Sequence, residues 1–214
     1  ETGAADSTEH AFRTLYNTLS FDRSDVVYVP VEKDSHIGGE YAQQIVEKLD
    51  GQDYLAVDGL NLPAFGSRSV ELSDGAPVEN ADCGAVASSA ETSAAVPFVL
   101  DGDHLQTPFY DVIFDERGYI SSLIDRENGR QLKGEGYALN TFLVAEDVPD
   151  SWDNWDLDMF YKKKPYEADE VSAPELMEAG PVRTVVRIRR RFADSTVDQD
   201  VILYPELPRI DFKT

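Results

Sequence analysis

Short runs of alternating apolar and polar residues, separated by turn residues, occupy most of the chain. Residues 25–31 (DVVYVPV) are β-branched and aromatic, and Pro30 predicts an edge strand because proline cannot donate a ladder hydrogen bond. Residues 41–49 fit either a short helical stripe or a strand. The turn dipeptide Asp50-Gly51 and the alternation of residues 52–60 favour strand–turn–strand over the helix.

Two further hairpins are predicted later in the chain. Residues 109–114 (FYDVIF) and 119–124 (YISSLI) flank a turn that ends in glycine, which tolerates positive φ. Residues 181–193 (PVRTVVRIRRRFA) and 196–204 (TVDQDVILY) predict the other hairpin, turning around Asp194-Ser195. Alternation within it places these side chains on a solvated sheet face: Arg183, Arg187, Arg189 and Arg191. Short strands joined by such turns predict an all-β sandwich.

Between these strand-rich parts the composition changes. Residues 74–97 contain small, polar and acidic side chains and no aromatic residue. Such a stretch cannot bury enough apolar area to offset the conformational entropy lost on ordering. We therefore predict an acidic linker over 74–97, between a small β-sandwich domain over 12–73 and part of a larger sandwich over 98–214.

The charge of the chain limits its partners. Its 214 residues include 41 acidic and 19 basic side chains, a net charge of −22, which argues against binding nucleic acids or anionic membranes. The arginine run at 187–191 is therefore interpreted as sheet surface, in preference to a polyanion site. No apolar run approaches the roughly 20 residues that span a bilayer. A single cysteine, Cys83, excludes an intrachain disulfide and favours a reducing compartment, so we expect a cytoplasmic location.

Patterns typical of catalytic or metal sites are missing. His10, His36 and His104 are scattered, without the spacing of zinc ligands. The sequence has no Gly-x-Ser-x-Gly motif, and Cys83 has no histidine nearby. We expect no catalytic residue, no metal site and no cofactor in this chain.

The most unusual segment is 146–161 (EDVPDSWDNWDLDMFY), which places two tryptophans among aspartates. An indole face can cover the apolar face of a pyranose ring, and carboxylates can accept hydrogen bonds from its hydroxyl groups. A strand edge, with Trp155 pointing inward and Asp156 toward water, explains the same pattern by alternation. Composition alone favours the strand edge.

Several phrases, taken in order, resemble the β-rich region of family 38 glycoside hydrolases, the retaining α-mannosidases. These phrases are residues 16–27 (YNTLSFDRSDVV), 61–66 (NLPAFG), 109–124, 139–158 and 205–212 (PELPRIDF). The phrase Trp-Asp-x-Trp-Asp at 152–156 is the most specific of them. A structural β domain of an unrelated acidic enzyme would require their order to be a coincidence.

The resemblance implies a small β-sandwich followed by part of a large galactose-mutarotase-like β-supersandwich, from a longer zinc-dependent enzyme. A start at Glu1 without methionine fits a piece of a longer protein. The family's zinc ligands and nucleophile do not map onto this chain, so zinc is expected only in the parent's catalytic domain. The expected role is to brace that domain and line its sugar pocket.

On this interpretation the substrate-binding residues are Trp152, Asp153, Trp155 and Asp156. The expected partners are an α-mannoside or mannose-containing glycan and the catalytic domain, and self-association into a homo-oligomer is left open. The alternative is a stand-alone carbohydrate-binding module that uses the same residues.

Overall fold

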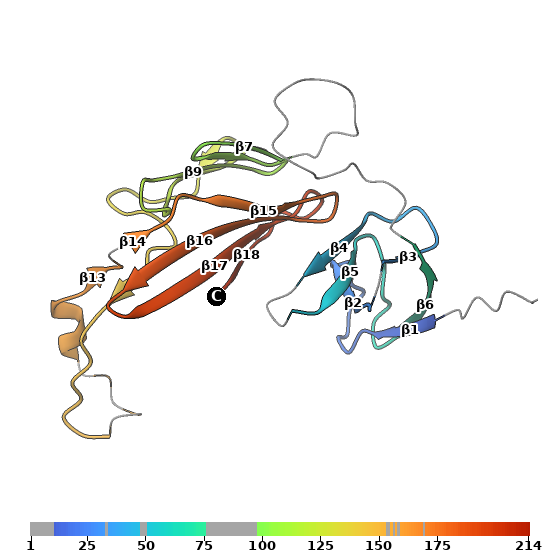
Figure 1. Cartoon of the computed structure of the whole chain (residues 1–214), viewed down its shortest axis with the longest axis horizontal. Helices are drawn as coiled ribbons and strands as arrows, with labels where there is room; N and C mark the ends of the chain where they lie inside the picture. Colours follow the sequence, from blue (N-terminus) through green and yellow to red (C-terminus); the bar gives the residue numbers. More distant parts are fainter. Residues whose placement is uncertain are drawn as a thin grey trace, which may run out of the picture. The chain divides into compact units, whose positions relative to one another are not determined.

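The computed structural model describes residues 11–32, 34–47, 51–75, 98–152, 155, 157, 159–168 and 170–214 (Figure 1). The chain divides into two compact units. Unit 1 comprises residues 1–96 with 180–182, and unit 2 comprises 97–179 with 183–214. Most of the predicted linker, with Cys83, lies outside the described residues. In the described part of the chain, no helix is long and apolar enough to cross a bilayer.

The described part of unit 1 forms two three-stranded antiparallel sheets, ordered β1-β6-β3 and β2-β5-β4. Their strands are β1 (Ala11–Tyr16), β2 (Val27–Pro30), β3 (Ser35–Ile37), β4 (Gln43–Glu47), β5 (Asp53–Val57) and β6 (Ser67–Asp74). Strand–turn–strand over residues 41–60 is confirmed, because β4 pairs antiparallel with β5. Pro30 lies on the edge strand β2, as its missing N–H predicted. β6 continues to Asp74, the first residue of the predicted linker.

The two sheets of unit 1 share one apolar core. Its buried members come from both sheets and from the loops beside them: Val29, Val31, Ile37, Leu55, Val57, Leu60, Val70 and Leu72. The buried Asn17 ties two loops of this unit together, because its Nδ2 donates to the carbonyls of Phe21 at 2.7 Å, Leu62 at 3.2 Å and Pro63 at 3.1 Å. Residues 16–27 and 61–66, which carry the sequence resemblance in this unit, are therefore neighbours in space.

Unit 2 is also built from antiparallel sheets. One has the order β11-β10-β9-β8-β7, another has the order β14-β16-β17-β18 with β15 paired to β16, and β12 pairs with β13. The strands of the first sheet are β7 (Val99–Asp101), β8 (His104–Gln106), β9 (Tyr110–Phe114), β10 (Ile120–Asp125) and β11 (Arg130–Gln131). The others are β12 (Leu143–Val144), β13 (Tyr166–Glu167), β14 (Glu170–Val171), β15 (Glu175–Ala179), β16 (Thr184–Phe192), β17 (Ser195–Leu203) and β18 (Ile210–Lys213).

The all-β prediction is confirmed, and both predicted hairpins of unit 2 are present as β9–β10 and β16–β17. The turn of the second hairpin was predicted one residue too late. Phe192 pairs with Ser195, so the loop consists of Ala193 and Asp194. Ala193 has φ +48°, in the left-handed region. The prediction was wrong because this conformation is more common for Asp, Asn or Gly than for Ala.

The predicted solvated face of β16 needs one correction. Arg189 and Arg191 are exposed and Arg187 is half-buried, but Arg183 is buried. Arg183 precedes the strand, so alternation within the strand does not govern it. Its guanidinium forms a bidentate pair with the Glu178 carboxylate at 2.9 and 2.8 Å, which satisfies the charge inside the protein.

Candidate functional site

The segment from β12 to β13, residues 143–167, projects beyond the end of the β16–β17 hairpin and is called the tryptophan arm (Figure 1). β12 and β13 pair at its base, with Leu143 opposite Glu167 and Val144 opposite Tyr166. A short 3₁₀ helix, η1 (Met159–Lys163), lies between them. Within the described residues of the arm, the regular structure consists of this two-residue strand pair and one helical turn, which is too little to form a core of its own.

Large apolar side chains are exposed along the part of the arm that the structure describes. In its described part no residue is buried. The exposed large apolar residues there are Leu143, Val148, Trp152, Trp155, Leu157, Met159, Phe160 and Tyr166. Scattered exposed apolar residues are ordinary, but such a concentration in one segment is typical of a surface that contacts another molecule or domain.

The two tryptophans of the arm are joined by a tight turn. The Trp155 N–H donates to the Trp152 carbonyl at 2.8 Å, and Trp152 takes φ +66°. Trp152 is 72% exposed and Trp155 is 87% exposed. The strand-edge interpretation, with Trp155 pointing inward, is therefore wrong. It failed because alternation produces an inward face only where a strand has a partner and a core beneath it, and neither is present among the described residues around Trp155.

Asp153 and Asp156, the other two predicted substrate-binding residues, lie outside the described residues. The prediction that all four side chains form one site stays a prediction. The described pair places two largely exposed tryptophans at the two ends of the same turn.

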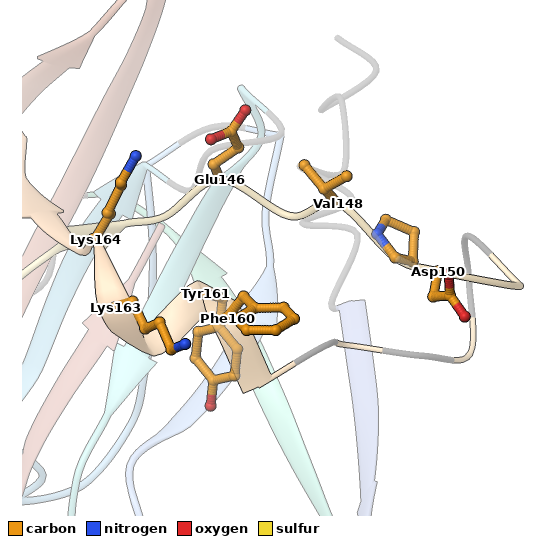
Figure 2. A pocket seen from close by; sticks show the side chains of 8 residues that line it. Glu146, Val148, Asp150, Phe160, Tyr161, Lys163 and Lys164 are labelled. Carbon is orange, nitrogen blue, oxygen red and sulfur yellow. The ribbon is translucent and has the colours of Figure 1, made fainter.

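A pocket of about 540 Å³ lies within the arm, between residues 146–150 and residues 160–164. Its lining combines aromatic, acidic and basic side chains: Glu146, Val148, Pro149, Asp150, Phe160, Tyr161, Lys163 and Lys164. Figure 2 shows the Phe160 and Tyr161 rings on one side of the pocket and Glu146, Val148 and Asp150 along the other. A pocket of this size is within the range of small-molecule sites.

The chemistry of the pocket suits a polar ligand with an apolar face. The Lys163 Nζ lies 4.3 Å from the Phe160 ring centroid, so the ammonium group and the ring hold each other in place by a cation–π contact. Carboxylates of Glu146 and Asp150 can accept hydrogen bonds, and the lysines can donate them. The sequence pattern pointed to the tryptophans of this segment as ligand-binding residues, and not to Phe160 and Tyr161. These two aromatic residues end the same segment, 146–161.

The described residues offer no zinc-binding set. No group of three or more His, Cys, Asp or Glu side chains lies close enough together in the described part of the chain to hold a metal ion. His104 pairs with the Asp111 carboxylate, and the His36 Nδ1 lies 3.3 Å from the Gly75 carbonyl oxygen. Both histidines therefore have local partners within their sheets, and His10 lies outside the described residues.

Comparison with known proteins gives consistent results. The family model "Glycosyl hydrolases family 38 C-terminal domain" matches residues 105–214, which is more than half of the chain. Alpha-mannosidase G of Dictyostelium discoideum is 25% identical over 211 residues, covering 95% of this chain and 19% of the relative. The chain thus spans about a fifth of the length of this curated relative.

A solved structure has the same fold. The crystal structure of a protein in the glycosyl hydrolase family 38 from Enterococcus faecalis superposes with a TM-score of 0.53 at 14% identity. The match covers 96% of this chain and 31% of that one. At this identity the likeness concerns the fold alone.

Proposed function

The chain belongs to glycosyl hydrolase family 38, and from this membership we propose that it is a non-catalytic β-rich part of a zinc-dependent retaining α-mannosidase. In this proposal the zinc ion and the catalytic carboxylates belong to a separate catalytic domain of the parent protein. Support comes from the relative named as an α-mannosidase, which is much longer than this chain.

The observation that carries the proposal is the exposed tryptophan arm. Apolar surface left in water costs about 25 cal/mol for each Å² that burial would have removed, so a free arm with this many exposed apolar side chains is unfavourable. Packing the arm against the catalytic domain would recover this free energy. The sheets of unit 2 would act as the rigid scaffold and the arm as its functional loop, a division of labour common among β domains.

The same arm has the chemistry to line a sugar pocket. Trp152 and Trp155 present indole faces suited to the C–H face of a mannose ring, and Glu146 and Asp150 supply hydrogen-bond acceptors in the adjoining pocket. Asp153 and Asp156 belong to the same proposal by their place in the sequence. The arm would then have two roles, because the side chains that face the catalytic domain would also border its substrate.

Substitutions in the full-length parent test this proposal. We expect Trp155→Ala or Asp156→Ala to lower kcat/KM for an aryl α-mannoside about tenfold, because each removes roughly 1.4 kcal/mol of transition-state binding. Phe212→Ala is the matched control, since Phe212 is an exposed aromatic residue of β18 outside the arm. Normal folding with unchanged kcat/KM in both arm variants would sink the proposal.

The alternative, a stand-alone carbohydrate-binding module, makes a different prediction. Both tryptophans of the chain lie in the arm, so intrinsic tryptophan fluorescence reports on the arm alone. We expect no saturable change when the isolated chain is titrated with mannose or manno-oligosaccharides, because half of the sugar site would be missing. Saturable quenching would favour the binding module over the bracing role.

The proposal extends to the ligand, the protein partner and the location. The ligand would be an α-mannoside or mannose-containing glycan, and the protein partner would be the catalytic domain, with self-association into a homo-oligomer left open. The location would be cytoplasmic, which the single cysteine favours.

A further inference from the structure

Arg190 is the one charged residue of β16 that faces the protein interior with its whole side chain. It is 0% exposed, whereas its strand neighbours Arg189 and Arg191 are exposed. Burial lowers the pKa of its guanidinium below the ordinary value, although arginine keeps its charge at any physiological pH. A buried arginine of this kind needs contacts that offset the desolvation of its charge.

These contacts come from three parts of unit 2: the β9–β10 turn, the residue before the arm, and the neighbouring strand β17. The guanidinium carbon lies 4.9 Å from the Tyr119 ring centroid and 4.6 Å from the Phe142 ring centroid, so the cation contacts two aromatic rings. Its Nη2 donates to the Gly118 carbonyl at 3.1 Å, and its Nη1 donates to the Gln199 Oε1 at 3.4 Å. Gly118 and Tyr119 belong to the turn of the β9–β10 hairpin, whereas Phe142 directly precedes the tryptophan arm.

Phe142 and its neighbours form the base of the arm. Ala168 directly follows β13, and its N–H donates to the Phe142 carbonyl at 3.2 Å. This hydrogen bond joins the two ends of the arm at its base. Leu139 exchanges backbone hydrogen bonds of 2.8 and 3.1 Å with Ile120 of β10. The Asn140 Nδ2 donates at 2.6 Å to the same Gln199 Oε1 that Arg190 contacts. The chain therefore enters the arm through contacts that converge on Arg190 and Gln199.

We infer that Arg190 is a positioning residue for the tryptophan arm: from inside the sheet it fixes Phe142 and thereby the direction in which the arm leaves unit 2. The guanidinium suits this task because it is planar, contacts aromatic faces and donates in several directions at once. The arm, which has no buried residue in its described part, depends on its base for orientation. The role of the arm in sugar binding rests on the proposed function, but its anchoring to Arg190 does not.

The experiment measures arm mobility without any sugar. Both tryptophans lie in the arm, so time-resolved tryptophan anisotropy of the full chain reports its motion, and hydrogen exchange reports the amides at its base. We expect Arg190→Met to speed the anisotropy decay and to raise exchange at residues 139–144 and 166–168 by about tenfold. Exchange in the β16–β17 ladder should change much less. Arg189→Met is the matched control, because it removes an arginine from the opposite, exposed face of the same strand.

Two more variants keep the test decisive. Arg190→Lys should give an intermediate effect, because lysine keeps the charge but loses the planar fork that contacts both rings. Phe142→Leu removes the ring from the arm side, where the residue is only half-buried, and should loosen the arm even if Arg190→Met fails to fold. Unchanged anisotropy in the variants that fold would overturn the inference. Equal increases of exchange at the arm base and in the β16–β17 ladder would overturn it as well, because Arg190 would then only stabilise the core.

Discussion

At the scale of single residues, burial decides what each arginine of β16 does. Arg189 pairs with Asp198 at the surface, with 62% of the Arg189 side chain exposed. Arg187 pairs with Asp200, whose side chain is only 12% exposed. Arg190 carries its charge into the interior. Alternation in the sequence separates Arg187 and Arg189 from Arg190, but a charged side chain inside a sheet could not be predicted without its aromatic partners, which lie about 50 to 70 residues away along the chain.

The two ion pairs should therefore differ in their contribution to stability. Both are bidentate, with N–O distances of 2.7 and 3.0 Å for Arg187–Asp200 and 2.6 and 2.8 Å for Arg189–Asp198. We expect Asp200→Asn to lower the free energy of unfolding by about 2 kcal/mol, because a half-buried guanidinium loses its charged acceptor. Asp198→Asn should cost clearly less, because water replaces the lost contact. Urea unfolding of both variants measures this, and equal losses would contradict it.

Acid stability offers a second residue-scale test. The hydrogen bond from Arg189 lowers the pKa of the Asp198 carboxyl below its ordinary value. A lowered native pKa means that the pair contributes its full stability above the unfolded carboxyl pKa of about 3.9, and loses it as the pH falls through the lower native pKa. We expect Asp198→Asn to make the melting temperature fall less steeply between about pH 4 and pH 2. If the melting temperature of the variant fell with pH as steeply as that of the unsubstituted chain, the Arg189–Asp198 pair would not be linked to folding.

At the scale of elements, turn chemistry was the part of the fold most open to prediction. The β4–β5 and β9–β10 hairpins follow from alternation and from turn residues between the strands. The β16–β17 hairpin follows from alternation, although its turn lies one residue earlier than predicted. The tryptophan arm was not predictable in the same way. Its alternation has the period of a strand, but a strand also needs a ladder partner, and the sequence does not show that β12 and β13 pair only at the base.

A single substitution in the loop of the β16–β17 hairpin should raise the free energy of unfolding. Ala193, the first of its two residues, has φ +48°, which costs an L-residue about 1–2 kcal/mol. Glycine removes this strain and loses part of the gain as chain entropy on folding. We expect Ala193→Gly to raise the free energy of unfolding by about 0.5–1 kcal/mol. Thermal unfolding measures it, with Ala179→Gly in β15 as a control that should destabilise; a lower melting temperature for Ala193→Gly would contradict the account.

At the scale of the whole molecule, the charge of −22 predicts weak binding to polyanions, but it does not identify a function. The fold class and the family were both open to sequence reasoning, because several phrases in a fixed order are specific even where single hairpins are not. The pocket within the arm was not, since its lining brings residues 146–150 together with residues 160–164, and alternation predicts no contact between two such segments.

Net charge also predicts a response to salt. With 41 acidic and 19 basic side chains, repulsion between like charges outweighs attraction between opposite ones. Because the screening length falls from about 10 Å at 0.1 M to about 3 Å at 1 M salt, we expect the melting temperature to rise over this range. NaCl and KCl should act alike, since screening does not depend on the cation. A melting temperature that falls with salt would mean that surface ion pairs dominate.

We propose that this chain supports α-mannoside hydrolysis in its parent protein without performing the hydrolysis itself. The most direct measurement is the hydrolysis of an aryl α-mannoside by the isolated 214-residue chain and by its full-length parent, each supplied with Zn²⁺. We expect turnover by the parent and none above the blank by the isolated chain, because the catalytic carboxylates and the zinc ligands would lie in the other domain. Zinc-dependent turnover by the isolated chain, or a folded parent without activity on α-mannosides, would contradict the claim.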